Sequence, residues 1–482
     1  MQDVARTPGD LGAARGHRLF WGEMHTHTFC GDSIFGEIET AADIASTHLD
    51  FWAPGEHCDN QEFDWPRLLR AVNGSHRSGE FVAFAGLERA GADGDYNAYF
   101  LQDDPDPYTG GPLDEFLAYA RAQGAVVIPH HTAYAVDHRG THWERHDPEL
   151  MPLAEIFSMH GCSERDDGPY PMDLAWMGPR ASGGAAVTGL ALGKCFGFIA
   201  SSDGHNAYPG AYPLGLVGCF ASELTRESLF EAFRARRTYA VTGDRIRAEF
   251  TVDGHLMGDV FTGGERRAIS LKIEGLDALD KVEVVRNGRV LRRLSGALDR
   301  EYPRAAGRYQ VRLGWGWGGA GTNVNWTAEL RIEDGEILAA SPCFSPPAVN
   351  RIEHLTPSEC VWVSRTGGYD ASWTTNRYRV GGDQSIVFTV GGDPGTRLRV
   401  TVNGRHLAYS LGELARESRV EFLRGAGDER FKFHHPLPES QYRLEAQFED
   451  DRPATDCDWY YVRVAQDNGQ MAWLSPIWVR RA

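Results

Sequence analysis

The stretch Trp21-Gly22-Glu23-Met24-His25-Thr26-His27-Thr28-Phe29-Cys30-Gly31-Asp32 decides how the chain is interpreted. It begins at the end of an apolar run, Leu19-Phe20-Trp21, and continues into two histidines one residue apart. Alternate side chains of an extended chain share a face, so His25 and His27 can hold one divalent ion together. Asp32 can reach back from the next loop toward a second ion. Taken alone, the pattern also fits two surface histidines beside a turn.

The composition is that of a globular protein with an acidic surface. The 482 residues are 42% hydrophobic and 24% charged, with a net charge of -18. This charge repels a phosphate backbone, so we expect no nucleic-acid partner. No apolar run of about 20 residues occurs, so we expect no membrane partner. The polar start of the chain and the eight irregularly spaced cysteines favour a cytoplasmic protein with reduced thiols.

Residues 1–245 alternate short apolar runs with helix-like segments. The predicted strands are Leu19–Glu23, Phe51–Pro54, Phe81–Gly86, Ala125–Pro129, Glu155–Ser158 and Gly197–Ser201. The predicted helices are Glu37–His48, Trp65–His76, Leu113–Gln123 and Ser228–Arg236. Alternating units of this length predict an α/β domain, in which helices cover a parallel sheet.

Residues 246–482 have a different sequence pattern. Runs in which apolar and polar residues alternate are separated by turn signals such as Asn287-Gly288, Asn403-Gly404 and Asn468-Gly469. Asn-Gly between alternating runs is a strong hairpin signal. We therefore expect an antiparallel β-sandwich region, either one sandwich or two with a break near residue 346. Eight of the thirteen tryptophans lie beyond residue 300, where they either pack the core or form a platform for sugar rings.

Histidines and carboxylates recur directly after the apolar runs of the first half. In a parallel barrel the carboxyl ends of the strands meet at one rim, where active sites lie. The sequence therefore predicts that these side chains converge there. They are His25 and His27, Glu56 and His57, Glu88, His130 and His131, His160, and Asp203 and His205.

A mixed set of imidazoles and carboxylates suits zinc, manganese or iron. The candidate donors exceed what one tetrahedral ion needs, so we expect two or three divalent ions, with Glu88 and Asp32 as bridging ligands. Clustered cations lower the pKa of bound water to about 7, which is a hydrolase design. The chain contains no Gly-x-Ser-x-Gly segment that would indicate a serine nucleophile.

The order and spacing of these motifs over residues 17–245 resemble the polymerase-and-histidinol-phosphatase (PHP) superfamily. Gly22–His27, Pro129–Thr132 and the β-rich tail with Asp458–Val464 are similar to the carbaryl-hydrolase-like (CehA/McbA) metallohydrolases. The resemblance implies a distorted, TIM-like (β/α)7 barrel with a di- or trinuclear site. It implies nine metal ligands: His25, His27, Asp32, His57, Glu88, His130, His160, Asp203 and His205.

Two positions depart from the pattern of the superfamily. Glu56 stands where an aspartate is usual, and His130-His131 stands where His-Pro is usual. The alignment makes His130 the ligand and leaves His131 to contact substrate or donate a proton, so we expect His131 and Asp203 to be catalytic. Arg89 and Arg165 either bind an anionic group near the rim or are ion-pair partners. The loop Asp137–Asp147 either lines the pocket mouth or is solvated.

The function predicted is that of a metal-dependent hydrolase acting on a small-molecule ester, with phosphoesters favoured. Carboxyl esters or aryl carbamates are the alternative, because the ligands are common to these chemistries. The alternative from another class is a carbohydrate-binding protein with an inactive barrel, which the tryptophan-rich second half would serve. A homodimer is also expected.

Overall fold

The strands and helices predicted in the first half are all present in the computed structural model. It describes residues 16–31, 36–174, 176–296, 305–319, 323–346, 349–367, 382–423, 429–451 and 455–481. The elements of the first half are β1 (Arg18–Glu23), α1 (Ile38–His48), β2 (Phe51–Trp52), β3 (Glu56–His57), α2 (Trp65–Ser75), β4 (Val82–Ala83), β5 (Ala85–Arg89), β6 (Asp95–Phe100), α3 (Leu113–Ala122), β7 (Val126–His130), β8 (Leu153–Ser158), β9 (Gly161–Cys162), α4 (Ala186–Ala191), β10 (Gly197–Ala200), β11 (Leu216–Ala221), α5 (Arg226–Arg234) and β12 (Thr238–Val241).

Local sequence explains where the helices form. In α1 the buried residues include Ile38, Ala41 and Ala45, which share the face that the i, i+3, i+7 spacing predicts. The side chain of Asp64 caps α2 by accepting a hydrogen bond from the backbone N–H of Arg67. Thr225 caps α5 in the same way.

The strands of the first half do not form the single closed (β/α)7 barrel of parallel strands that we expected. They divide among three hydrogen-bonded sheets. Four strand pairs are parallel: β1–β2, β2–β4, β3–β5 and β8–β10. Four others are antiparallel: β1–β11, β11–β12, β5–β6 and β6–β7. The turn at residues 91–94 explains the insertion of β6, because so short a connection can join only antiparallel strands.

The second half is almost entirely β-structure, as its turn signals predicted. Its strands are β13 (Arg247–Val252), β14 (His255–Leu256), β15 (Val260–Gly263), β16 (Arg267–Glu274), β17 (Leu279–Arg286), β18 (Arg289–Leu294), β19 (Gly307–Gly316), β20 (Asn323–Cys343), β21 (Arg351–Leu355), β22 (Glu359–Gly367), β23 (Asp383–Val402), β24 (Arg405–Ser410), β25 (Arg419–Phe422), β26 (Arg430–Phe433), β27 (Leu437–Pro438), β28 (Arg443–Asp450), β29 (Cys457–Gln466) and β30 (Met471–Arg481). Two short helices accompany them, α6 (Leu411–Arg416) and α7 (Glu439–Tyr442).

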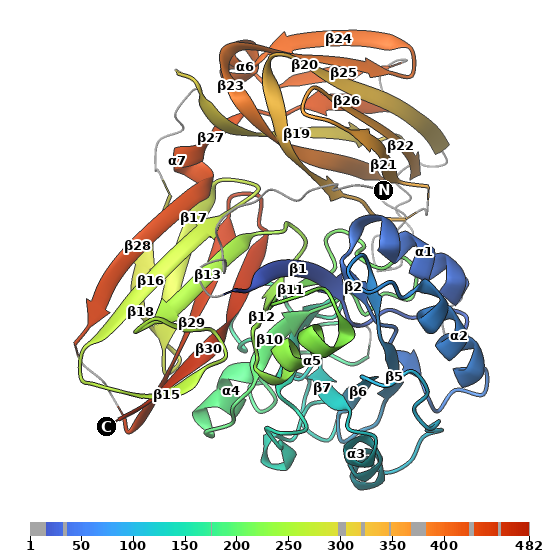
Figure 1. The fold of residues 1–482 in the computed structure, drawn as a ribbon, viewed down its shortest axis with the longest axis vertical. Coiled ribbons are helices and arrows are strands. Elements are labelled where there is room, and N and C mark those ends of the chain that lie inside the picture. Colours follow the sequence, from blue (N-terminus) through green and yellow to red (C-terminus); the bar gives the residue numbers. More distant parts are fainter. Residues whose placement is uncertain are drawn as a thin grey trace.

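These strands belong to three sheets (Figure 1). Strands β14-β13-β16-β28 form a four-stranded antiparallel sheet, and β19 to β27 form a nine-stranded sheet with strands from both sides of residue 346. Strand β30 pairs with β12, so β17, β18, β29 and β30 extend the sheet that contains β1. The end of the chain therefore lies in the same sheet as the strand that leads to His25. The limits at residue 245 and near residue 346 stay predictions.

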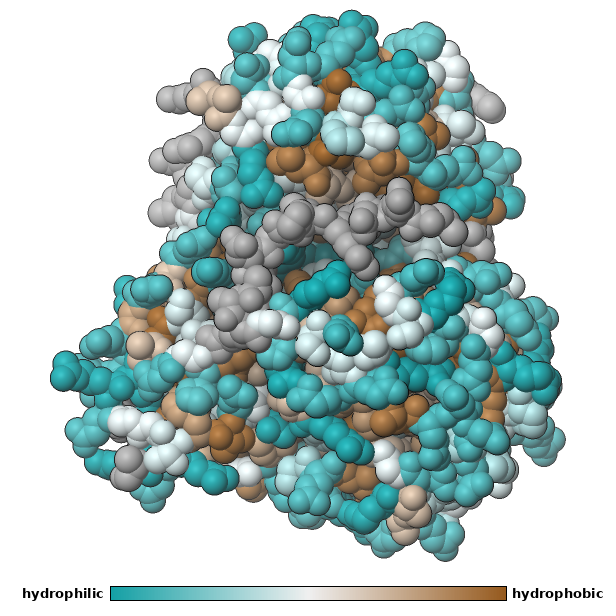
Figure 2. Space-filling view, in the orientation of Figure 1, coloured by the Kyte–Doolittle hydropathy of each residue, from teal (hydrophilic) through white to brown (hydrophobic). Residues whose placement is uncertain are grey.

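The tryptophans of the second half mostly pack inside the protein. Trp315, Trp326, Trp362 and Trp473 are among the largest fully buried side chains. Polar side chains cover most of the face shown in Figure 2. These four tryptophans therefore do not form a row of exposed rings on which sugars could stack. Within the part of the chain that the structure describes, no helix has both the length and the apolar composition needed to cross a bilayer.

Candidate metal centre

The segment after β1 lies beside the segment after β10, and this pairing brings the first donors together. The backbone N–H of His27 donates to the carbonyl of Gly204 over 3.0 Å, and that of Asp203 donates to the carbonyl of His25 over 2.9 Å. The rings of His27 and His205 stack with their centroids 4.0 Å apart. The strand ends therefore position His25, His27, Asp203 and His205 without help from a distant loop.

Neighbouring strands deliver the next donors to the same place. His57 on β3 pairs in register with Glu88 on β5. His130 ends β7 opposite Asp95 on β6. Gly55 leaves room for the cluster, because a Cβ at this position would lie 2.6 Å from the ring of His25. A larger residue at position 55 would displace the imidazole at the centre of the site.

His25 lies at the middle of the cluster. Its Nε2 is 3.1 Å from Glu88 Oε2, 3.2 Å from His27 Nε2 and 3.6 Å from Asp203 Oδ1. Its Nδ1 lies 3.2 Å from Glu155 Oε2. A carboxylate behind the outer nitrogen fixes the ring of a metal-binding histidine and raises its basicity. His25 thus has the surroundings of a ligand on both of its ring nitrogens.

The remaining donors surround two carboxylates. Glu88 Oε1 is 3.2 Å from His130 Nε2 and 3.7 Å from His57 Nδ1. Asp203 Oδ2 is 3.1 Å from His160 Nε2, while its Oδ1 is 3.3 Å from His27 Nε2. Five triads have ligand atoms within 4.8 Å of one another: His27–His57–His205, His25–His130–Asp203, His25–His27–Glu88, Asp95–His130–His131 and His131–His160–Asp203.

Burial and mutual charge shift the pKa values in this cluster. Against the effect of burial, His57 and His130 hold the pKa of Glu88 well below its usual value. Burial lowers the pKa of His130 to about 3, so its ring is neutral and able to bind a cation at neutral pH. Burial would also lower the pKa of His25, but Asp203 and Glu155 outweigh it and raise that pKa well above the usual value.

His131 faces a different partner from His130. Its Nε2 lies 3.0 Å from Asp95 Oδ2, which also accepts a 2.7 Å hydrogen bond from Arg139 Nε. The other oxygen of Asp95 accepts from the backbone N–H of Gly91 over 2.7 Å. Among the non-glycine residues with positive φ are His131 (31°) and Asp203 (52°), and such strained backbone is frequent at functional sites.

Sequence reasoning did not identify Asp95, Arg139, Glu155 or Tyr134, whose hydroxyl lies 2.8 Å from His160 Nδ1. Asp95 begins the fully buried strand β6, and Glu155 lies inside the fully buried strand β8. For Glu155 the available signal was a charged residue inside a largely apolar run, because such a residue needs a partner.

Other predicted residues have different positions. Asp32 lies outside the described residues. Glu56 accepts hydrogen bonds from the backbone and the hydroxyl of Thr28, at 3.1 and 2.6 Å, and so holds the turn after His27. Arg89 is an ion-pair partner of Asp93. In the loop Asp137–Asp147, Arg139 reaches the centre.

Solvent reaches the cluster at one edge. The side chains of His57 and His205 are 16% and 15% exposed, whereas those of His25 and His27 are fully buried. A small molecule would therefore approach the donors past His57 and His205.

Comparison with known proteins finds relatives and a structural neighbour. A family model described as a protein of unknown function (DUF3604) matches residues 210–256. An uncharacterized protein of Chlamydia pneumoniae is 28% identical over 59% of this chain and 50% of its own length. An uncharacterized protein of Chlamydia trachomatis is 25% identical over 57% of this chain and 48% of its own length. The chain thus spans about half the length of these curated relatives.

A solved structure from Bacteroides vulgatus, of a two-domain protein containing a predicted PHP-like metal-dependent phosphoesterase, is 14% identical. It covers 85% of this chain and 99% of its own, with a TM-score of 0.38. That score is too low for the fold to be assigned from this neighbour.

Proposed function

We propose that the protein is a metal-dependent hydrolase of the PHP superfamily that uses two or three divalent ions against a small ester. Phosphoesters are favoured, and carboxyl esters or aryl carbamates are the second candidates. The observation that supports this most is the overlap of three ligand triads, His27–His57–His205, His25–His130–Asp203 and His25–His27–Glu88, which share His25 and His27. Shared donors are what adjacent ions require. We further propose a cytoplasmic homodimer without nucleic-acid or membrane partners.

The residues present fit divalent ions. The two Nε2 atoms of His25 and His27 face each other over 3.2 Å. Neither ring nitrogen of His130 makes a hydrogen bond, although Nε2 lies 3.2 Å from Glu88 Oε1. We assign zinc, manganese or iron to His25, His27, His57, Glu88, His130, His160, Asp203 and His205. Such ions lower the pKa of bound water and neutralise charge that develops on the substrate.

His131 and Asp203 are the proposed catalytic residues. Asp95 accepts a hydrogen bond from His131 Nε2 and thereby orients the ring. His131 and Arg139 lower the pKa of Asp95 against the effect of burial, so Asp95 stays ionised. We assign His131 to deliver a proton to the leaving group. Asp203, which lies between His27 and His160, is assigned to orient the attacking water by accepting its hydrogen bond.

The test is hydrolysis of para-nitrophenyl phosphate, bis(para-nitrophenyl) phosphate and para-nitrophenyl acetate with added manganese or zinc. We expect turnover that a chelator abolishes and that metal restores, with a phosphate ester as the best substrate. Turnover that survives chelation contradicts the proposal. Elemental analysis of protein purified without chelators should find two or three equivalents of metal, and finding none contradicts it as well.

A further inference from the structure

Two of the proposed metal ligands, Asp203 and His205, lie in the connection between two strands. Strand β10 ends at Ala200 and β11 begins at Leu216. Asp203 and Ala207 have positive φ angles of 52° and 50°, which non-glycine residues keep only where their surroundings hold them there. The positions of both ligands therefore depend on contacts that the rest of the chain makes with this connection.

The carboxylate of Glu23 holds the part of the connection that runs from Ser202 to Gly210, which we call the ligand loop. Its Oε1 accepts a 2.9 Å hydrogen bond from the backbone N–H of Ser202 and a second one from the Ser202 hydroxyl. Its Oε2 accepts a hydrogen bond from the backbone N–H of Gly210. Glu23 is fully buried and belongs to none of the five ligand triads. One side chain thus binds both ends of the ligand loop.

Glu23 also ties the ligand loop to a particular strand. It is the last residue of β1, which leads directly to His25 and His27. The triad His27–His57–His205 takes one ligand from the segment after β1 and another from the ligand loop. The distance between these two ligands therefore depends on how the loop lies against β1, and the hydrogen bonds of Glu23 fix that relation.

The two ligands of the loop depend on Glu23 to different degrees. The backbone N–H of Asp203 donates to the carbonyl of His25 over 2.9 Å, so Asp203 is also held directly by the segment after β1. His205 lies further along, on the part of the loop that continues to Gly210. Its ring stacks on the ring of His27, with the centroids 4.0 Å apart. A shift of the loop would therefore displace His205 more than Asp203.

The far side of the ligand loop has a support of its own. Tyr208 is buried in the apolar core of the nine-stranded sheet, together with Val311 on β19 and Phe388 on β23. Because this packing does not involve Glu23, a change at Glu23 should shift the loop relative to β1 without unfolding it.

We propose that Glu23 is a positioning residue that holds His205 opposite His27 and thereby sets the affinity of the ion bound by His27, His57 and His205. The inference rests on the proposed function, because it requires that this triad binds a divalent ion. Residues that orient metal ligands typically change metal affinity by about 10- to 100-fold. The effect should be confined to one ion, since His25, Glu88 and His130 lie outside the ligand loop.

The test is calorimetric titration with zinc, at pH 8, of the full chain after its metal has been removed with a chelator. The unaltered protein should bind two or three equivalents. Glu23→Gln keeps the shape of the side chain but turns an N–H group toward a backbone N–H group, so one end of the ligand loop is released. It should weaken one equivalent at least about tenfold and leave the affinity of the others unchanged.

Two further variants show whether the effect passes through His205. Ser202→Ala removes one donor to Glu23, is the milder change, and replaces Glu23→Gln in the test if circular dichroism shows that variant to be unfolded. It should weaken the same equivalent by about threefold. His205→Ala removes a ligand of that equivalent. In a protein that already carries His205→Ala, neither Glu23→Gln nor Ser202→Ala should lower zinc affinity further.

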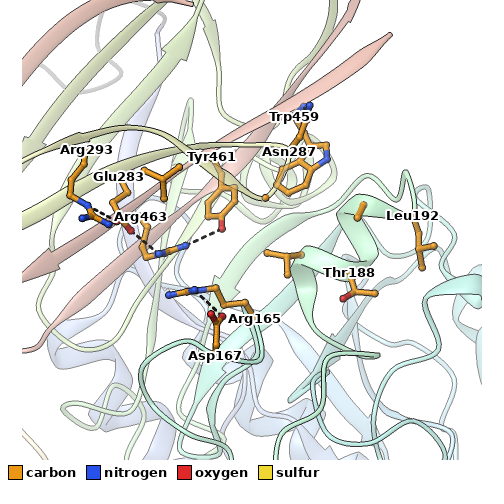
Figure 3. A pocket seen from close by; sticks show the side chains of 14 residues that line it. Arg165, Asp167, Thr188, Leu192, Glu283, Asn287, Arg293, Trp459, Tyr461 and Arg463 are labelled. Carbon is orange, nitrogen blue, oxygen red and sulfur yellow. Dashed lines mark hydrogen bonds and ion pairs between the residues drawn. The ribbon is translucent and has the colours of Figure 1, made fainter. Parts of the chain in front are cut away.

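The matched control is Glu283→Gln, at another buried glutamate. Glu283 lies in a cleft between α4 and β29, where it pairs with Arg293 and Arg463 (Figure 3). Glu283→Gln should lower stability, as a change at a buried carboxylate does, but it should leave zinc binding as in the unaltered protein.

Unchanged zinc binding in Glu23→Gln, or in Ser202→Ala where it replaces Glu23→Gln, would overturn the inference. Equal weakening of every equivalent, a further loss of affinity in the absence of His205, or the same loss in Glu283→Gln would do so too. In each of these cases the unaltered protein still binds zinc, and the proposed function stands. Absence of zinc binding by the unaltered protein would overturn both.

Discussion

Buried charges are handled differently in the metal centre and in the ion-pair network around Glu164. The carboxylate of Glu164 is fully buried, yet Tyr461, Arg463 and Trp473 all donate hydrogen bonds to it. Arg463 in turn pairs with Glu283. The chain itself supplies every opposite charge in this network, which is what burial of structural ions requires.

The buried carboxylates of the metal centre have mostly histidines as partners. Glu88, Glu155 and Asp203 are buried with histidines as their ion-pair partners, and Arg139 compensates Asp95. A histidine is a cation only when protonated, and burial holds the pKa of His130 near 3. The structural network thus pairs its carboxylates with arginine, whereas Glu88, Glu155 and Asp203 face histidines, which can exchange a proton for a divalent ion.

The largest expected effect comes from removing a carboxylate of the metal centre. Glu88→Gln should abolish metal binding and lower kcat/KM at least about thousandfold, since about 4 kcal/mol of transition-state stabilisation depends on the ions. Elemental analysis and the ester assays measure this. Glu144→Gln, at an exposed glutamate, is the control. Full metal occupancy in the Glu88 variant would remove the contrast between the two regions.

Breaking the structural network should affect stability and leave metal binding intact. Glu164→Gln leaves Arg463 with one of its two carboxylates and should lower the free energy of unfolding by about 3 kcal/mol. Urea unfolding measures the change, and metal content should equal that of the unaltered protein. Glu265→Gln, which removes the exposed partner of Arg481, should change little. Loss of metal in the Glu164 variant would show that the regions are not separate.

Glu23 represents a third case, a buried carboxyl that accepts hydrogen bonds from backbone and hydroxyl donors, including the N–H of Ser202. Burial raises the pKa of Glu23 from 4.5 to about 7. The folded state therefore keeps a proton that the unfolded state releases, so stability falls as pH rises from about 4.5 to 7, by at most about 3 kcal/mol. This decline should disappear in Glu23→Gln.

Urea unfolding of the metal-free protein between pH 4 and 8, with and without the Glu23→Gln substitution, measures this pH dependence of stability. Glu80→Gln, at an exposed position, is the control, and its free energy of unfolding should vary with pH as in the unaltered protein. If the free energy of unfolding of Glu23→Gln also varied with pH in that way, the hydrogen bonds to Glu23 would be keeping its carboxyl ionised.

The smallest expected effect concerns the orientation of His131. Asp95→Asn should lower kcat about 10- to 100-fold while the metal content stays unchanged, because the ring loses an ionised partner without losing a donor to the metal. Asp93→Asn, two residues away, is the matched control and should retain activity. Loss of metal together with activity would make Asp95 a ligand and would extend the metal centre.

Much of the candidate site could be predicted because its donors follow strands. His25, His27, Glu88, His130 and Asp203 end or follow apolar runs, and that relation is local in the sequence. Glu155 could not be predicted in the same way, since it lies inside a strand and its role depends on which side chain faces it. Asp95 was missed because it begins β6, whose antiparallel insertion depends on pairing with β5 and β7.

The sequence by itself determined the positions of α1, α2, α3 and α5, the β-rich character of the second half of the chain and the residue types that can hold divalent ions. These follow from periodicity, turn chemistry and ligand preference, which act over a few residues. Only the tertiary structure decided that β30 joins β12, that Asp95 faces His131 and that α4 opposes β29 across a cleft. Those contacts join segments distant in the chain, and their free energy depends on packing and hydrogen bonding that no local pattern records.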